Sequence, residues 1–115
     1  MRDSAERLRD IVEAIAAIER HSHCEKQAFE RDELLQTWFV RHRQIIGKAA
    51  RAIPEEIRAL APGIPWHQIA GMRNVLVHGY FEVDTDLVWD AATREVPALK
   101  PAIGRLLATL NPASE

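Results

Sequence analysis

Four residues between Arg73 and Tyr80 could bind an anion and move protons. Arg73 offers a rigid fork of N–H donors that suits a phosphate or a carboxylate. His78 carries the side chain that gains and loses a proton near neutral pH, as general acid–base catalysis requires. Asn74 precedes His78 by four residues and can orient its ring, and Tyr80 adds a phenolic hydroxyl. These residues are therefore the candidate catalytic or binding groups of the chain.

The residues around this segment predict a helix from Trp66 to His78. Pro65 suits the start of that helix, and Gly79 suits the position just after its C-terminus. Apolar residues occupy most of its surface, which predicts that it is largely buried. Four of its residues fall on one narrow stripe: His67, Gly71, Asn74 and His78.

An alternative interpretation of the same segment is a pair of short strands. Val75–Val77 and Tyr80–Val83 are rich in β-branched and aromatic residues, and they flank His78 and Gly79. The pattern alone leaves both alternatives open.

A continuous helix would separate the two main candidate groups. Arg73 and His78 would point about 140° apart, too far to share one substrate. Either the last turn unwinds at Gly79, or two subunits contribute residues across a dimer axis. We expect a homodimer, because two-fold pairs are the commonest oligomers and Gly71 would permit a close helix approach.

The rest of the chain predicts more helices. Apolar residues at three- and four-residue steps predict one helix over 4–20, capped by Asp3 or Ser4, and a longer one over 25–52. Pro54 ends the longer helix and begins a short one, with the proline at its first position.

The C-terminal third is expected to be helical as well. Asp84 can cap the helix that follows it. Pro97 and Pro101 predict that the stretch to Leu110 is either two helices or one kinked helix. Five helical pieces with short links predict an all-α antiparallel bundle, and residues 1–115 are expected to form one domain.

Composition limits the function classes. The chain has 115 residues, a single cysteine and a net charge of −2. It shows no signal-peptide core and no apolar run long enough for a membrane, so we expect a cytoplasmic protein. With this charge, any contact with nucleic acid must come from a local patch.

Other polar groups have plainer explanations. His21, His23 and Cys24 could ligate zinc, but their spacing matches no standard structural zinc site. We therefore expect a polar loop between helices and no metal site. Asp84 and Asp86 resemble a nucleotidyltransferase metal pair, yet no phosphate-binding glycine motif precedes them. His42 is expected to be a satisfied interface residue. Four cations form either an RNA-tracking stripe or a solvated helix face: Arg41, Arg43, Lys48 and Arg51.

The segment from Ile64 to Asp84 closely resembles the HepT-like branch of the HEPN families. That branch carries the motif Arg-x-x-x-x-His-x-Tyr, which Arg73, His78 and Tyr80 match. The resemblance extends upstream to Gln44–Ala50 and downstream to Asp86–Trp89, and so covers most of the chain.

The resemblance implies an activity and a partner. HepT-like proteins are toxins of two-gene toxin–antitoxin modules, of the type VII kind, and act as dimeric, metal-independent endoribonucleases. By resemblance, Arg73 binds the scissile phosphate of RNA, His78 moves a proton at the ribose 2′-hydroxyl or the leaving oxygen, and Asn74 supports the site. An MntA-type nucleotidyltransferase is the expected antitoxin, and it would transfer AMP to Tyr80. No cofactor, DNA or membrane is implied.

Two positions depart from the pattern of many relatives. Glu82 stands where they have glycine, and Lys48 stands where they have an acid. Glu82 adds negative charge near the expected RNA site. The alternative is therefore a non-catalytic HEPN partner that binds the nucleotidyltransferase or a nucleotide.

Overall fold

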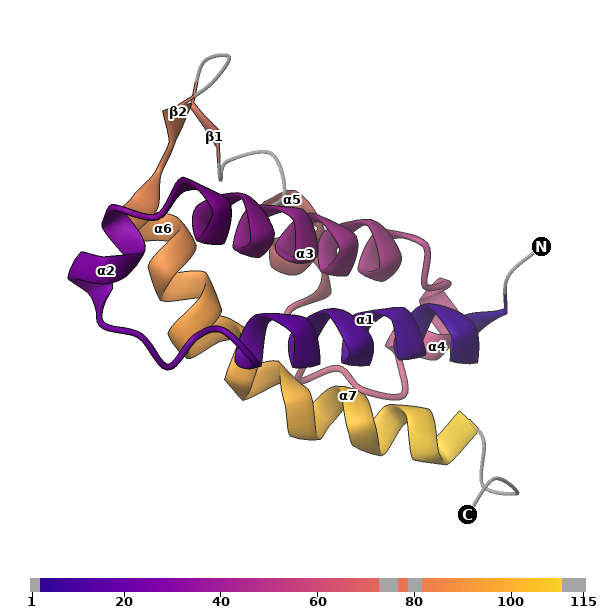
Figure 1. Cartoon of the computed structure of the whole chain (residues 1–115). Helices are drawn as coiled ribbons and strands as arrows, with labels where there is room; N and C mark the ends of the chain where they lie inside the picture. Colours follow the sequence, from indigo (N-terminus) through magenta and orange to yellow (C-terminus); the bar gives the residue numbers. More distant parts are fainter. Residues whose placement is uncertain (1–2, 73–76, 79–81, 111–115) are drawn as a thin grey trace.

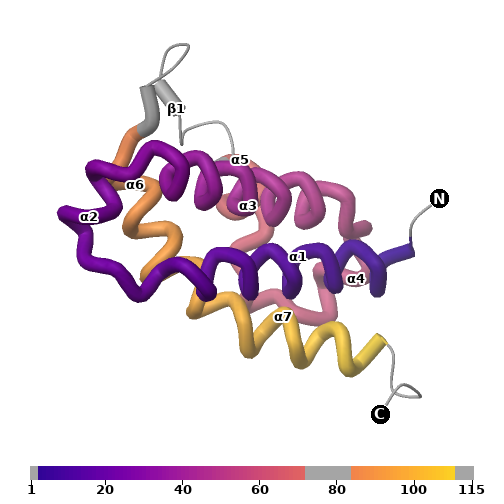
Figure 2. The backbone as a smooth tube through the Cα atoms, viewed as in Figure 1, coloured from indigo at the N-terminus to yellow at the C-terminus, as the bar shows by residue number. Residues whose placement is uncertain are grey.

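A computed structural model of the chain describes residues 3–72, 77–78 and 82–110. Three long helices, α1 (Ser4–Glu19), α3 (Glu33–Arg51) and α7 (Val96–Leu110), run side by side in the described part. Figures 1 and 2 show α1 between α3 and α7, and α1 packs against both. A fourth helix, α5 (Trp66–Met72), packs against α3. The predicted all-α class is confirmed.

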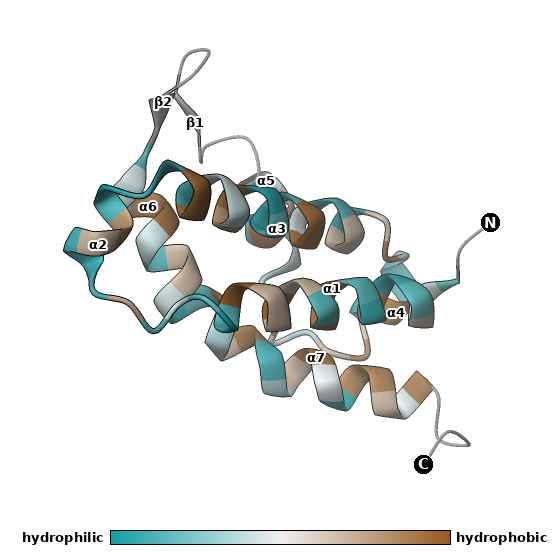
Figure 3. Cartoon of the chain, in the orientation of Figure 1, coloured by the Kyte–Doolittle hydropathy of each residue, from teal (hydrophilic) through white to brown (hydrophobic). Residues whose placement is uncertain are grey.

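Helix α1 forms as its sequence predicts. Oδ1 of Asp3 accepts a hydrogen bond from the Glu6 amide at 2.8 Å, which caps the helix start. Its apolar face is buried against α3 and α7, and its polar face stays outside, as the two colours of Figure 3 show along each long helix. The buried residues are Leu8, Ile11, Ala14, Ile15, Ala17 and Ile18.

The single helix predicted over 25–52 is wrong, because the chain turns a corner there. It forms α2 (Lys26–Glu30) and then α3, with Asp32 between them capping α3 through the Leu35 amide at 3.0 Å. Nε2 of Gln36 donates to the carbonyls of Phe29 and Glu30 at the end of α2, at 3.0 and 3.2 Å. These two side chains satisfy the helix ends that a continuous helix would not have.

Burial of Phe29 also favours this corner. Its ring is fully buried and stacks on Phe39 with centroids 5.3 Å apart. Trp89 covers it from α6 (Thr85–Asp90) at a centroid distance of 5.2 Å. The corner therefore brings α2 and α6 together over one aromatic cluster.

A second short helix, α4 (Glu55–Arg58), follows α3 as predicted. Pro54 lies at its N-cap, one position before the predicted one. Nη2 of Arg58 donates to the carbonyls of Ala50 and Arg51, each at 3.2 Å, and so caps the end of α3.

The helix predicted from Trp66 to His78 is also wrong at its C-terminal end, because Val77 and His78 lie in a strand. The described part of α5 extends to Met72, and two short strands come later in the chain: β1 (Val77–His78) and β2 (Glu82–Val83). They pair antiparallel, with Val77 opposite Val83 and His78 opposite Glu82. The alternative of two short strands is thus the one that the described residues adopt, because β-branched valines favour extended backbone.

Residues 85–110 form one continuous helical run. Asp84 caps α6 through the Leu87 amide at 3.0 Å, as predicted. Between α6 and α7 lies a π-helical segment, Ala91–Glu95. In an α-helix the ring of Pro97 would clash with the carbonyl of Thr93. Thr93 lies in the π-helical segment, where the turn is wider than in an α-helix. Pro101 is accommodated inside α7.

In the parts of the chain that the structure describes, no helix combines the length and the apolar character needed to cross a membrane.

Candidate functional site

The strand pair β1–β2 contains one of the predicted site residues. His78 lies in β1, and its backbone partner in β2 is Glu82. Arg73, Asn74 and Tyr80 lie outside the described residues. His78 therefore does not belong to the helix that carries His67 and Gly71, and the predicted four-residue polar stripe is wrong.

Helix α5 is the element that leads into this segment. Trp66 and Ile69 are buried on its inner face, and Nε1 of Trp66 donates to the Ala61 carbonyl at 3.2 Å. His67 and Gly71 are exposed, so the helix is only half buried rather than largely buried. A Cβ at Gly71 would meet no atom within 4 Å in the described residues, so packing within the chain does not require glycine there.

A buried arginine holds the C-terminal half of α5. Arg43 on α3 is 1% exposed. Its Nη1 donates to the Ile69 carbonyl at 3.1 Å. A cation beside the last carbonyls also suits the negative end of the helix dipole.

The same guanidinium forms a two-pronged ion pair with Glu95 in the π-helical segment. Nε lies 2.6 Å from Oε1, and Nη2 lies 3.0 Å from Oε2. This geometry uses the planar fork of arginine, which lysine lacks. Arg43 thus connects three elements, α3, α5 and the π-helical segment.

Sequence reasoning missed this role. Arg43 had been grouped with Arg41, Lys48 and Arg51 as an exposed stripe or face, and for Arg43 both interpretations are wrong. A signal was present, because Arg43 recurs at three- and four-residue steps with Phe39, Ile46 and Ala50 on the buried face. Glu95 has the same relation to Ala91, Ala92 and Leu99. A base and an acid that each fall on an apolar stripe indicate a buried pair.

His42 is a satisfied interface residue, as predicted. Its Nδ1 lies 2.8 Å from the Trp38 carbonyl, which can only accept, so Nδ1 carries the proton. The ring packs on Trp38 with centroids 4.3 Å apart. Nε1 of Trp38 in turn donates to the Ala17 carbonyl of α1 at 2.9 Å. The group joins α1 to α3.

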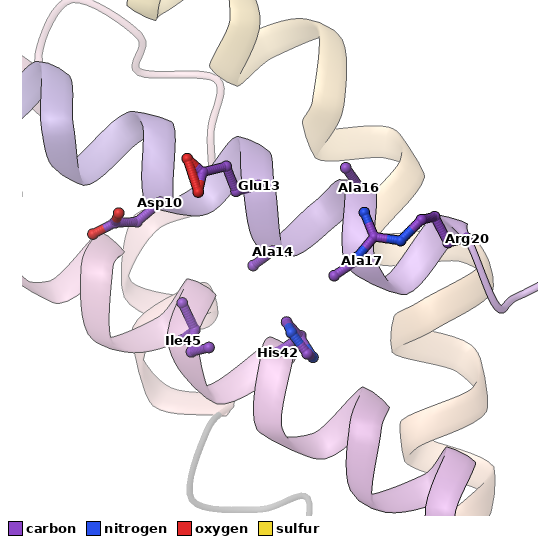
Figure 4. Close-up of a pocket in the computed structure, with 8 residues that line it drawn as sticks. All are labelled: Asp10, Glu13, Ala14, Ala16, Ala17, Arg20, His42 and Ile45. Carbon is purple, nitrogen blue, oxygen red and sulfur yellow. The ribbon is translucent and has the colours of Figure 1, made fainter.

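A hollow of about 560 Å³ lies between α1 and α3 beside His42 (Figure 4). Asp10, Glu13 and Arg20 on α1 line one side, and His42 and Ile45 on α3 line the other. Its described lining residues come from α1, from Arg20 at the C-cap of α1 and from α3, and none of them comes from α5 or the strands.

The His21–Cys24 loop shows local contacts. Sγ of Cys24 donates to the His21 carbonyl at 3.8 Å, and the His21 ring meets Trp38 edge-on. In the residues that the structure describes, no group of three or more histidine, cysteine or acidic side chains is arranged to hold a metal ion.

Comparison with known proteins identifies the family to which the chain belongs. The family model described as "Ribonuclease HepT-like" matches residues 6–106. A Thermococcus cleftensis protein named "Probable ribonuclease HepT" is 38% identical over 101 residues, 86% of this chain and 91% of that protein. A Caldanaerobacter subterraneus subsp. tengcongensis protein named "Putative RNase" is 37% identical over 90 residues, 78% of this chain and 80% of that protein.

An archaeal relative agrees. A Methanocaldococcus jannaschii protein with the same kind of name is 33% identical over 103 residues, 89% of this chain and 94% of that protein. No solved structure matches the chain. The helical fold and these matches define a ribonuclease class of the HEPN type. The chain belongs to the HepT-like ribonuclease family.

Proposed function

We propose that the chain is a metal-independent endoribonuclease whose working residues are Arg73, Asn74 and His78. The observation that carries this proposal is the family match over residues 6–106, which includes all three. The structure supports it in one respect. Because His78 lies in strand β1 and not in a continuation of α5, the 140° separation calculated for a continuous helix does not apply.

The proposed chemistry uses only side chains of the protein. The ribose 2′-hydroxyl attacks the adjacent phosphorus, and the bond to the 5′-oxygen of the next nucleotide breaks. The products are a 2′,3′-cyclic phosphate and a free 5′-hydroxyl. His78 takes the 2′-hydroxyl proton or supplies one to the leaving oxygen, and Arg73 stabilises the charge on the phosphate. Asn74 orients the imidazole.

The direct test is cleavage of a fluorescent single-stranded RNA in buffer with EDTA. We expect His78→Ala to lower the cleavage rate by about 10²–10⁴-fold, the usual contribution of a general acid or base. Arg73→Ala should lower it comparably. His23→Ala is the matched control, because it removes an exposed histidine from the loop between α1 and α2. A His78→Ala protein as active as wild type would disprove the mechanism.

The biological setting that we propose is a toxin–antitoxin module. An MntA-type nucleotidyltransferase would transfer AMP from ATP to Tyr80: the phenolic oxygen attacks the α-phosphorus, pyrophosphate leaves, and the phenol proton passes to solvent. The added anion, two residues from His78, would exclude RNA and offset the charge of Arg73. Intact mass after co-expression with the neighbouring gene tests this, since a gain of AMP units should vanish in Tyr80→Phe.

A homodimer is part of the proposal, since two subunits can combine residues at one site. Helix α5 offers an exposed surface at His67 and Gly71 for such contact. Mixing Arg73→Ala with His78→Ala subunits tests shared sites. Recovered cleavage in the mixture supports pooling across the axis, and its absence indicates that each site lies within one subunit.

The second candidate is a non-catalytic HEPN partner that binds the nucleotidyltransferase or a nucleotide. The position of Glu82 favours it, because this acid is the ladder partner of His78. Expression without the neighbouring gene separates the two candidates. Growth arrest that is lost with Arg73→Ala supports the nuclease, and normal growth with wild-type protein supports the binding role.

A further inference from the structure

Charge is distributed unevenly along the chain. Residues 34–81 hold six of the fifteen Lys and Arg residues but only two of the seventeen Asp and Glu residues, a net charge of +4. The remainder holds nine cations and fifteen acids, a net charge of −6. A protein that is acidic overall therefore has one basic section, which contains α5 and all of α3 except its first residue, Glu33.

The structure places part of this positive charge on one surface of α3. Arg41, Gln44, Lys48 and Arg51 are all exposed and recur at three- and four-residue steps, so they share one side of the helix. We call these four residues the basic face. Arg43 points about 160° away from Arg41 around the helix and is buried, so it does not contribute.

The cations of the basic face are not neutralised. In the described residues the side chains of Arg41, Lys48 and Arg51 form no ion pair, and no acid occurs between Leu34 and Pro54. Some other cations do have acidic partners, such as Lys26 with Asp86 at 2.7 Å and Lys100 with Glu19 at 2.9 Å. On α1, Arg7 follows Glu6 and Arg9 precedes Asp10, so each arginine has an acid next to it in the sequence. The basic face is therefore a local region of positive charge in a protein whose net charge is negative.

The basic face lies on the helix that supports the candidate site. Helix α3 packs against α5, as seen behind it in Figure 1, and α5 ends one residue before Arg73. From Arg41 to Arg51 the face extends about 15 Å along the helix axis. The described part of the candidate segment, His78 in β1, comes after α5 in the chain.

We propose that the basic face binds the phosphate backbone of the RNA substrate, independently of its base sequence. This inference rests on the proposed ribonuclease function and adds a binding surface to it. Backbone binding uses cations with polar donors between them, as this face provides. A protein interface would need an apolar centre. The large apolar residues that the structure shows exposed, Leu34 and Leu60, both lie outside the face.

The test compares two triple variants that lose the same charge. The first is Arg41→Gln, Lys48→Gln, Arg51→Gln. The control is Arg9→Gln, Arg20→Gln, Arg105→Gln, which removes three exposed arginines from α1 and α7. Both are made in the His78→Ala protein, so that RNA stays intact during binding. The probe is a fluorescein-labelled single-stranded RNA, with affinity measured over a range of salt concentrations.

We expect the first triple variant to bind at least about tenfold more weakly at low salt. Its plot of log affinity against log salt should be shallower by about 2, because each lost contact with a single strand contributes about 0.7. The control should stay near the parent. A version with Arg41→Lys and Arg51→Lys, which keeps the charge, should retain binding.

Three results would overturn the proposal. Equal weakening in both triple variants would mean that bulk charge, not this face, binds RNA. No weakening in either would place the RNA elsewhere. Unchanged RNA binding with lost capture of the neighbouring gene product would assign the face to a protein. Failure of the ribonuclease function itself looks different, because wild-type protein would then cleave no RNA.

Discussion

Arg43 and Glu95, 52 residues apart in the sequence, meet through two parallel hydrogen bonds of 2.6 and 3.0 Å. The side chain of Arg43 is 2% exposed and that of Glu95 is 19% exposed. The third bond of Arg43 reaches the Ile69 carbonyl at 3.1 Å. The guanidinium of Arg43 therefore joins α3 to both α5 and the π-helical segment.

Removing the acid of this pair should be costly. Glu95→Leu leaves a cation buried without its partner, and we expect a loss of about 3–5 kcal/mol in the free energy of unfolding. Arg43→Met should cost less, because Glu95 can reach water. The double variant should recover much of the loss. Urea unfolding measures all three.

A second ion pair between helices provides the control for that experiment. Lys100 and Glu19 join α7 to α1 at 2.9 Å, and both side chains are partly exposed. Glu19→Gln should therefore cost no more than about 1 kcal/mol. A Glu95→Leu protein as stable as Glu19→Gln would show that the buried pair has no special role.

The corner between α2 and α3 should depend on Asp32. Asp32→Ala removes the acceptor for the Leu35 amide, and we expect a loss of about 1 kcal/mol, the usual value of an N-cap. Asp32→Asn keeps an acceptor and should stay close to wild type. The measurement is thermal unfolding of wild type, Asp32→Ala and Asp32→Asn. Equal unfolding midpoints for the three proteins would contradict the capping role.

The indole of Trp38 should stabilise the contact between α1 and α3. Trp38→Phe removes the donor to the Ala17 carbonyl but keeps an aromatic ring against His42. The expected loss is about 1–2 kcal/mol, from one hydrogen bond and reduced packing. Urea unfolding measures this loss. Trp66→Phe serves as a comparison, because the indole of Trp66 also donates a hydrogen bond to a carbonyl. A Trp38→Phe protein of wild-type stability would argue against this contact.

The ion pair between Lys26 and Asp86 predicts how the stability of the protein changes with pH. Its hydrogen bond to Asp86 raises the pKa of Lys26 above its ordinary value of 10.5. Stability from this pair is therefore fully present below about pH 10.5 and is lost as pH rises through the higher folded value. The difference in melting temperature between wild type and Lys26→Gln should shrink above that pH. An unchanged difference would contradict the ion pair.

Local signals in the sequence predicted the local structure. The caps at Asp3 and Asp84 and the apolar period of α1 depend on neighbours in the chain, and all three are confirmed. The helix over 25–52 was wrong because Gln36 and the burial of Phe29 stabilise a corner that local periodicity cannot reveal. In the same way, the hydrogen bond from Arg43 to α5 depends on a residue 26 positions away.

The candidate site was recognised by its pattern, not by its geometry. The motif of Arg73, His78 and Tyr80 indicates the family, and the family is confirmed. The backbone predicted for Val77 and His78 was wrong, because apolar residues with valine suit both a buried helix and short strands. Of these predicted site residues, the described part contains only His78, so their roles remain predictions.

The bond from Arg43 to Ile69 has a mechanical consequence. A force that pulls on the end of α5 stretches this bond, and through the guanidinium it also pulls on Glu95. Load placed on the segment after Met72 is thus shared by α3 and the helical run that ends in α7. The described elements around the candidate segment should respond to such a load as one stiff unit, and they should loosen together when the guanidinium is removed.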